Sequence, residues 1–218
     1  MNEYRAMQLA ARRKFSGFSL VEMAIVLAIV GLLLGGLLPS ISSQMEQQRR
    51  NETRKLMDEI KDALIGYTII NGKLPCPATA TYGEADSTCT NPSSDNYLPW
   101  KTLGVSETDA WGGKWLYRVE PAFASSVPFT LTTTSNATLD LQVRDSAGNR
   151  LTTASERPLA IIFSTGPNLV ADGGNASFET TSNATYQSDT PNQSFDDITI
   201  WISRPQLINR MVAAGKLP

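Results

Sequence analysis

One uninterrupted apolar stretch near the N-terminus constrains this chain more than any other feature. Residues 18–38 form a run of twenty-one residues in which Glu22 is the only charged side chain. A helix of that length, rising about 1.5 Å per residue, spans the roughly 30 Å hydrocarbon core of a bilayer. A carboxylate inside such a span costs on the order of 3 kcal/mol, so we expect Glu22 to have a specific partner.

The residues that lead into this run form a specific motif. Residues 17–23 read GFSLVEM, and the apolar run after them ends at Pro39. This pattern resembles the N-terminal processing and methylation segment of type IV pilins and of the pseudopilins of type II secretion. The resemblance implies that a prepilin peptidase cuts between Gly17 and Phe18 and methylates the new amine of Phe18. It also implies that Pro39 bends the helix.

A cleavable secretory signal peptide is the alternative interpretation of the N-terminus, because basic residues before an apolar stretch fit that pattern too. The apolar run is longer than the usual signal-peptide core, and the motif at residues 17–23 precedes it. N-terminal sequencing separates the two. A mature chain that begins at methylated Phe18 supports the pilin interpretation, and one that begins beyond Pro39 defeats it.

Cleavage would give Glu22 a natural counterion. The new α-amine of Phe18 lies four residues before Glu22, on the same face of a helix. Opposite charges attract strongly where the dielectric constant is low, and a buried pair fixes register better than it adds stability. The pair forms either within one chain or with the Phe18 amine of a neighbouring subunit. Our hypothesis is that the intermolecular pair aligns incoming subunits.

Charge and length set the topology and the domain plan. Residues 1–17 carry four basic side chains and one acidic one, so their removal changes the net charge from −2 to −5. The positive charges before the apolar run place the N-terminus in the cytoplasm and the rest across the membrane. A mildly acidic chain has no basic surface for nucleic acid.

We therefore divide the chain into four parts. These are a removed prepilin leader (1–17), a transmembrane and filament-core helix (18–39), an amphipathic continuation of that helix (40–71) and a periplasmic, globular, pilin-like head (72–218). The head is long enough for one compact domain with its own core. The predicted localisation is the bacterial inner membrane, spanned once, and then an extracytoplasmic filament.

The second half of the predicted helix shows an apolar stripe at helical spacing. The stripe consists of Met45, Leu56, Ile60, Leu64 and Tyr67, widened by Met57, Ala63 and Ile70. The pairs Arg54/Asp58 and Lys55/Glu59 are spaced for ion pairs on an exposed face. Gly72 serves as the C-terminal cap.

The head alternates strand-like runs with turn signals and closes with a short helix that begins at Arg204-Pro205. The runs are residues 115–119, 129–133, 139–144, 159–164 and 198–203. The predicted fold class is therefore α+β. A long N-terminal helix precedes an antiparallel β-sheet head, and a short C-terminal helix follows it.

Two cysteines occur in the chain, Cys76 and Cys89, and both lie on the exported side. That compartment oxidises thiols, so a disulfide is the favoured state. Closing a loop of this size stabilises the fold by about 3 kcal/mol in the chain-entropy model. A metal pair is the alternative, but the chain has no histidine, and two thiolates alone make a poor zinc site.

Parts of the head strengthen the resemblance. Residues 109–117 are similar to a turn and strand of the major pseudopilins, and residues 164–174 with 196–201 are similar to their C-terminal loop, which in those proteins holds calcium. Carboxylates suit calcium as ligands, and four lie here: Asp172, Asp189, Asp196 and Asp197. A solvated loop with turn-forming Asp and Asn is the alternative. Asn175 also matches a glycosylation acceptor pattern, to which we assign no sugar.

The alternative that this chain is an enzyme is disfavoured by its sequence. Histidine is absent, and so are a metalloprotease HExxH motif, a nucleophile elbow and a P-loop. The sequence instead predicts a structural subunit of a type IV pilus-like filament, with the type II secretion pseudopilus favoured. A minor type IV pilus pilin that acts in adhesion or pilus assembly is the alternative. The expected partners are a prepilin peptidase, other pilin subunits and an inner-membrane assembly platform.

Overall fold

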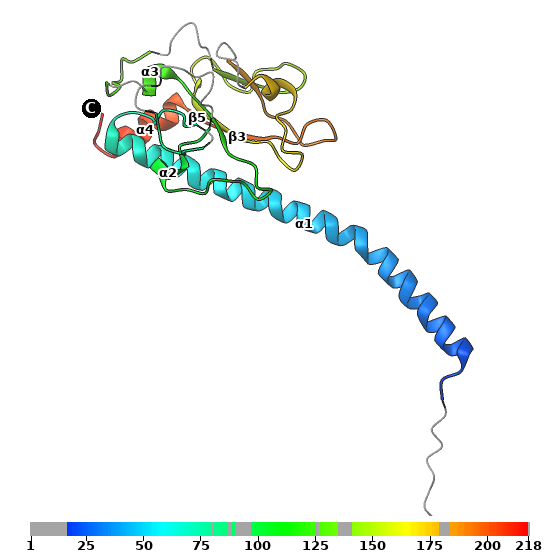
Figure 1. The fold of residues 1–218 in the computed structure, drawn as a ribbon. Helices are drawn as coiled ribbons and strands as arrows, with labels where there is room; N and C mark the ends of the chain where they lie inside the picture. The colour runs from blue at the N-terminus through cyan, green and yellow to red at the C-terminus, as the bar shows by residue number, and fades with distance from the viewer. Residues whose placement is uncertain are drawn as a thin grey trace, which may run out of the picture. The chain divides into compact units, whose positions relative to one another are not determined.

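The computed structural model describes residues 17–79, 81–86, 89, 97–124, 127–134, 141–178 and 184–217. The chain divides into two compact units, Met1–Glu46 and Gln47–Pro218, which we treat separately. Helix α1 (Leu20–Asn71) contains 52 residues and belongs to both units (Figure 1). The prediction of a long N-terminal helix is confirmed.

The first unit consists, in its described part, of the first half of α1 and the three residues before it. Its large apolar side chains are exposed, with Leu20 at 87% and Leu32 at 79% of their full accessible surface. Within the described residues, the structure contains no helix with enough length and apolar character to cross a membrane.

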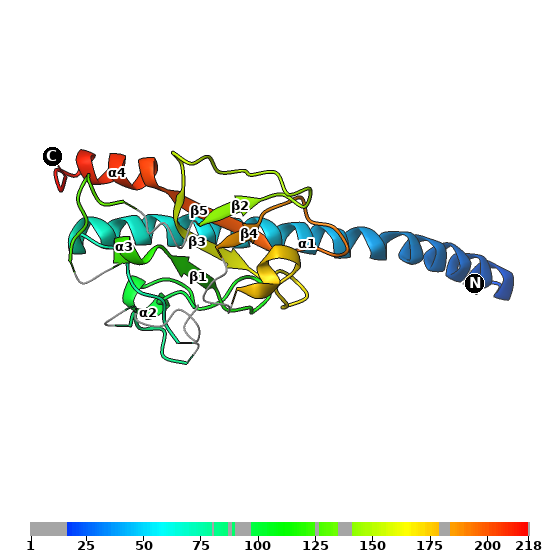
Figure 2. The same ribbon diagram turned by 90° about the horizontal axis from the view of Figure 1, so that it is seen from above.

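The second unit contains one antiparallel sheet and one smaller parallel strand pair. Its elements after α1 are α2 (Trp100–Leu103), β1 (Leu116–Val119), α3 (Pro121–Ala124), β2 (Gln142–Arg144), β3 (Pro158–Ser164), the 3-10 helix η1 (Gly173–Ser177), β4 (Thr185–Gln187), β5 (Ile198–Ser203) and α4 (Arg204–Ala213). Three strands form the sheet in the order β1-β3-β5, with β3 in the middle (Figure 2). The predicted α+β class and antiparallel sheet are confirmed.

The central sheet is buried on both faces because its strands alternate between two apolar clusters. On β3, Ala160 and Ile162 join the cluster that also contains the buried residues of α1 and α4. The intervening Ile161 and Phe163 join a second cluster with β2 and β4. The second unit is therefore layered, with helices on one face of the sheet and the β2–β4 pair on the other.

Only part of the predicted apolar stripe on α1 is buried. Met57, Ile60 and Leu64 are at most 1% exposed, whereas Met45 is 53% and Ile70 is 78% exposed. The prediction that Met45 and Ile70 belong to the stripe was therefore wrong.

The strand prediction failed at residues 129–133. Phe129 is buried and packs against Phe123 with ring centroids 5.0 Å apart, and Thr130 to Thr133 form a turn. The Arg204 side chain donates hydrogen bonds to the carbonyls of Leu131 and Thr133, at 2.8 and 3.3 Å. These carbonyls are therefore already bonded and do not pair with a neighbouring strand.

Candidate functional site

The predicted cleavage point lies directly before the start of α1. Gly17, Phe18 and Ser19 lie outside regular secondary structure, and the Phe18 side chain is 80% exposed. A peptidase reaches a non-helical, exposed backbone more easily than one inside a helix. The geometry is therefore compatible with cleavage between Gly17 and Phe18, which stays a prediction.

Glu22 takes part in a reciprocal pair of hydrogen bonds at this helix start. The backbone N–H of Glu22 donates to Ser19 Oγ at 3.1 Å, and the backbone N–H of Ser19 donates to Glu22 Oε2 at 3.3 Å. This arrangement is a capping box, which satisfies two backbone donors that a helix start leaves open. The capping box was not predicted, although the Ser-x-x-Glu spacing of residues 19–22 is its signal.

Pro39 lies inside α1, well away from either end of the helix. The side chains of residues 35–41, including that of Pro39, lie outside the described part of the structure. A proline in a helix interior removes one backbone hydrogen bond and favours a kink. The bend at Pro39 therefore stays a prediction.

Three of the four predicted metal ligands come together in the second unit. Asp172, Asp196 and Asp197 each place one carboxylate oxygen within 4.8 Å of the other two. The backbone N–H of Asp172 donates to Asp197 Oδ2 at 3.0 Å, and that of Asp196 donates to Asp172 Oδ2 at 3.1 Å. These bonds join the segment before η1 to the segment before β5. We call these three residues the aspartate cluster.

Asp189 lies outside the aspartate cluster. Its Oδ2 accepts the backbone N–H of Ser146 at 2.9 Å, and its Oδ1 accepts that of Thr190 at 2.8 Å. The hydrogen bonds from Ser146 lower the pKa of Asp189. Asp189 therefore holds the loop after β4 against the turn after β2, and the predicted set of four ligands is reduced to three.

Asp197 is the buried member of the aspartate cluster, with 2% of its surface exposed. Its Oδ2 accepts hydrogen bonds from Asn175 and Asp172, whereas its Oδ1 is buried and accepts none in the described structure. Burial raises the pKa of Asp197 to about 7, against the effect of those two hydrogen bonds, and the carboxylates of Asp172 and Asp196 add to the increase. A buried oxygen without a donor, beside two other carboxylates, fits a divalent cation.

Asn175 holds the aspartate cluster in place from η1. Its side chain is fully buried, and its Nδ2 donates to Asp197 Oδ2 at 2.8 Å and to the carbonyl of Gln187 at 3.1 Å. Its Oδ1 accepts the backbone N–H of Gln187 at 2.8 Å. From the sequence, Asn175 was considered only as a sugar acceptor, and this structural role was not predicted. The available sequence signal was the glycine pair at positions 173 and 174, just before Asn175. A side chain at Gly174 would crowd the side chain of Gln187, so the close approach of this segment to Gln187 requires glycine.

A glycine is required where the loop after β3 approaches the aspartate cluster. Gly166 has a φ of +63°, and a Cβ atom there would lie 2.5 Å from Asp196 Oδ1. Both the left-handed backbone and the lack of space exclude a larger residue. The position of Asp196 therefore depends on Gly166.

The turn that resembles a pseudopilin turn is organised by Asp109. Its Oδ1 accepts the backbone N–H groups of Trp111 and Gly113, at 2.9 and 2.8 Å. Its Oδ2 accepts the hydroxyl of Ser164 at 2.5 Å, at the end of β3. The buried carboxylate of Asp109 thus connects this turn to the start of the loop that contains Gly166.

The predicted disulfide is confirmed. Cys76 and Cys89 are bonded, with Cα atoms 5.1 Å apart, and no free cysteine remains. Both sulfur atoms lie near the carbonyl of Ala124, so the bridge holds the loop after α1 against α3. The alternative of a thiolate metal pair is contradicted.

Comparisons with known proteins support the prediction of a processing segment at the N-terminus. A family model described as the prokaryotic N-terminal methylation motif matches residues 12–38, which include Gly17, Phe18 and Glu22. The chain is also 26% identical to type II secretion system core protein G of Pseudomonas aeruginosa over 106 residues, which are 49% of this chain and 75% of that protein. The chain is pseudopilin-like.

These similarities have consequences for the partners and the class of the chain. The methylation motif implies that this pseudopilin-like chain meets a processing peptidase and other pilin subunits. The family is a structural one. No solved structure matches the chain.

Proposed function

We propose that this pseudopilin-like chain is a structural subunit of a type II secretion pseudopilus. The observation that carries the proposal is the processing segment, in which an exposed Gly17–Phe18 bond precedes a capped helix with an apolar first half. The similarity to core protein G supports type II secretion as the system in which the subunit works. The chain would act by polymerising, and a separate cytoplasmic ATPase would supply the energy.

The apolar run at residues 18–38 would serve two purposes in turn. Before assembly it would anchor the chain in the inner membrane, with the leader in the cytoplasm and the head in the periplasm. After assembly the same residues would pack against those of other subunits, which buries apolar area at about 25 cal/mol per Å². The inner-membrane assembly platform would transfer subunits between the two states.

The carboxylate of Glu22 would guide this transfer. In the uncut chain it accepts the backbone N–H of Ser19. Once residues 1–17 are removed, the charged amine of a neighbouring Phe18 would offer a stronger, charge-assisted partner. Glu22 would then set the register of the incoming subunit, and Pro39 would bend the helix for packing.

Calcium is the cofactor that the aspartate cluster fits. Asp172, Asp196 and Asp197 would supply carboxylate oxygens, and backbone carbonyls and water would complete the six to eight ligands that calcium takes. The buried Oδ1 of Asp197 supports this assignment, since it accepts no hydrogen bond in the described structure. The ion would stabilise the loop between β3 and β5 and would take no part in a reaction.

A minor type IV pilus pilin is the second candidate function. It is favoured by the extent of the chain beyond the region similar to core protein G, because the match covers only 49% of this chain. Assembly with pseudopilins or with pilins, measured by co-purification, separates the two candidates.

Intact-mass analysis of the chain from membranes tests the proposed function. With an active prepilin peptidase, the expected product begins at Phe18 and is one methyl group heavier than the bare sequence. Gly17→Val should leave the full precursor, because a branched side chain obstructs the peptidase, whereas the matched Ser16→Ala should be cut as usual. A wild-type chain that keeps residues 1–17 in the presence of the peptidase would overturn the proposal.

A further inference from the structure

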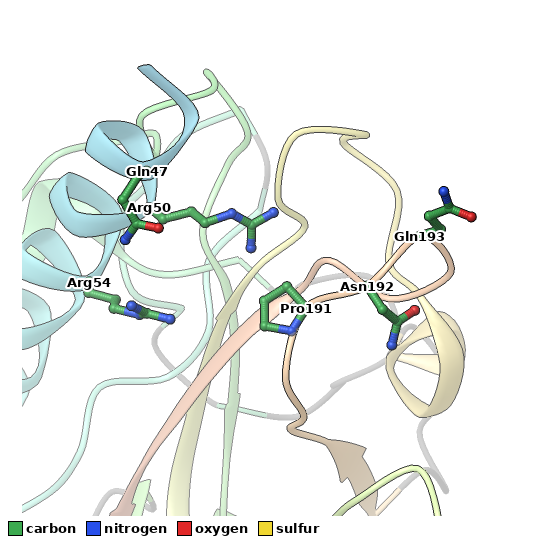
Figure 3. A pocket seen from close by; sticks show the side chains of 6 residues that line it. All are labelled: Gln47, Arg50, Arg54, Pro191, Asn192 and Gln193. Atoms are coloured by element: carbon green, nitrogen blue, oxygen red, sulfur yellow. The ribbon is translucent and has the colours of Figure 1, made fainter. Parts of the chain in front are cut away.

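A hollow of about 520 Å³ in the second unit lies between α1 and the loop that joins β4 to β5. Its lining residues are Gln47, Arg50, Arg54, Pro191, Asn192 and Gln193. Among the residues that the structure describes, this lining contains two arginines and no carboxylate. Figure 3 shows the side chains of Arg50 and Arg54 extending from α1 toward Pro191. We call this space the arginine hollow.

The fold holds Arg50 in place at the arginine hollow. Its guanidinium carbon lies 6.0 Å from the ring centroid of Trp111, in the turn organised by Asp109. This turn is fastened to α1, because the backbone N–H of Ala110 donates to the hydroxyl of the buried Thr53 at 3.4 Å. Stacking uses the face of a guanidinium, whereas its five N–H donors lie in its plane. Arg50 can therefore stay on Trp111 while it donates to a ligand.

Arg54 has no such anchor. Its side chain is exposed, and within the described part of the chain it forms no hydrogen bond and no ion pair. The predicted pair Arg54/Asp58 is therefore absent, whereas the predicted pair Lys55/Glu59 is formed, with its charged atoms 3.7 Å apart. The guanidinium of Arg54 thus keeps its donors for a ligand.

Asn192 supplies a donor from the loop. Its Oδ1 accepts the backbone N–H and the hydroxyl of Ser194, both at 2.8 Å. These two bonds fix the orientation of the amide, so its Nδ2 is the group left for a ligand. The backbone N–H of Asn192 donates to the carbonyl of Phe195 at 2.7 Å, which closes the loop into a turn. The arginine hollow therefore has donors on both sides, from α1 and from the loop.

The charges around the arginine hollow select an anion. An adjoining hollow of about 310 Å³ shares Arg54 but contains the carboxylates of Asp58, Asp189 and Asp197. These carboxylates repel an anion, so the arginine hollow is the favourable side of Arg54. A phosphate monoester carries a charge of about −1.5 to −2 and three acceptor oxygens, and guanidinium groups bind it with two parallel hydrogen bonds. A carboxylate has one charge and two oxygens, so it matches this set of donors less well.

We propose that the arginine hollow binds a phosphate monoester, with Arg50, Arg54 and Asn192 donating to its oxygens. The hollow is large enough to hold part of the organic group that carries the phosphate. This phosphate belongs either to a soluble organic molecule or to a lipid headgroup. The site does not depend on filament assembly, so the proposal stands apart from the proposed function.

Titration with glycerol 1-phosphate tests the site in the full chain, reconstituted in phosphatidylcholine bilayers at constant ionic strength. Tryptophan fluorescence should change saturably, because Arg50 contacts Trp111, with a dissociation constant of about 0.1–1 mM. Arg54→Gln should bind about tenfold more weakly, because it removes a charged donor. Its melting temperature should equal that of the wild type, since Arg54 has no partner in the described fold.

Two further variants separate a built site from a general attraction of anions to a basic helix. Arg49→Gln removes an exposed arginine of the same helix that does not line the arginine hollow, so it should bind within about twofold of the wild type. Arg54→Lys keeps the charge but loses the planar pair of donors, so it should bind roughly threefold more weakly. Calorimetry should give the same ranking as fluorescence.

The composition of the bilayer identifies the source of the phosphate. Phosphatidic acid has a phosphate monoester as its headgroup, whereas phosphatidylglycerol has a phosphodiester. If a lipid supplies the phosphate, bilayers with phosphatidic acid should weaken the binding of added glycerol 1-phosphate roughly fivefold relative to bilayers with phosphatidylglycerol, because the headgroup occupies the hollow. Equal binding in the two bilayers would assign the site to a soluble organic phosphate. Both results support the site.

Two results would overturn the proposal. One is the absence of any saturable change in the wild-type chain, and the other is an equal loss of affinity in Arg49→Gln and Arg54→Gln. Neither result bears on the proposed function, which fails only if the wild-type chain keeps residues 1–17 in the presence of the peptidase.

Discussion

Ser19 and Glu22 cap the start of α1 reciprocally, with each side chain accepting the backbone N–H of the other residue at 3.1 and 3.3 Å. The capping box places the Glu22 carboxylate against the backbone N–H of Ser19, the second residue after the predicted cleavage point. The carboxylate that caps the helix in the precursor is thus close to the amine that cleavage would create.

The first prediction separates the charge of Glu22 from its capping role. Glu22→Gln keeps a side-chain acceptor for the Ser19 N–H but removes the charge, so filament assembly should fall roughly tenfold, as it should for Glu22→Ala. Ser19→Ala removes one capping hydrogen bond at a cost of about 1 kcal/mol and should change assembly less than twofold. Electron microscopy of sheared filaments measures the yield, and membrane fractionation should show unchanged insertion. Normal assembly of Glu22→Gln would contradict the ion-pair hypothesis.

The second prediction concerns calcium. In detergent, the full chain should melt roughly 5–10 °C higher with calcium at about a hundred times its dissociation constant than with a chelator. Asp197→Asn and Asp172→Asn should abolish this increase, because each removes a charged ligand. Asp189→Asn should keep it, because Asp189 instead binds the backbone of Ser146. No increase in the wild-type chain would favour a solvated loop.

The third prediction tests Asn175. Asn175→Ala removes a buried amide that bonds to Asp197 and Gln187, so the free energy of unfolding should fall by about 2–3 kcal/mol. Asn168→Ala removes an exposed amide that bonds to Asp172 and should cost less than about 1 kcal/mol. Urea denaturation followed by tryptophan fluorescence measures both. Equal losses in the two variants would show that burial of Asn175 is unimportant.

The fourth prediction concerns the disulfide between Cys76 and Cys89. Replacing both cysteines by serine should lower the free energy of unfolding by about 3 kcal/mol and the melting temperature by roughly 6–12 °C. A reducing agent should lower the melting temperature of the wild-type chain by a similar amount and leave the double variant unchanged. A reducing agent that shifts both proteins equally would mean that its effect is unrelated to the bridge.

Sequence reasoning performed well where the signal was local. The long helix, the cap at Gly72 and the strands around Tyr117, Ile161 and Ile200 all follow from residue spacing within one element. It failed for β4, because three residues carry too little periodicity. It also failed at residues 129–133, where an apolar residue and threonines suggested a strand, because Arg204 binds two of the carbonyls there.

At the candidate metal site, too, the sequence predicted the local feature but not the contacts between distant segments. Composition identified an aspartate-rich loop, but the sequence treated Asp172, Asp189, Asp196 and Asp197 alike. Only the hydrogen bonds between segments separate Asp189 from the other three. The burial of Asp197 depends on Asn175, which lies 22 residues earlier in the chain.

By itself, the sequence determined the processing motif, the helix that follows it and the partnership of its two cysteines. The motif and the helix depend on the order and spacing of nearby residues. The disulfide follows because the chain has only two cysteines. The tertiary structure alone decided which carboxylates meet, which of them is buried and which charges on α1 remain exposed. These properties arise when β3, β5 and η1 pack together, and the free energy of that packing comes from contacts between residues far apart in the chain.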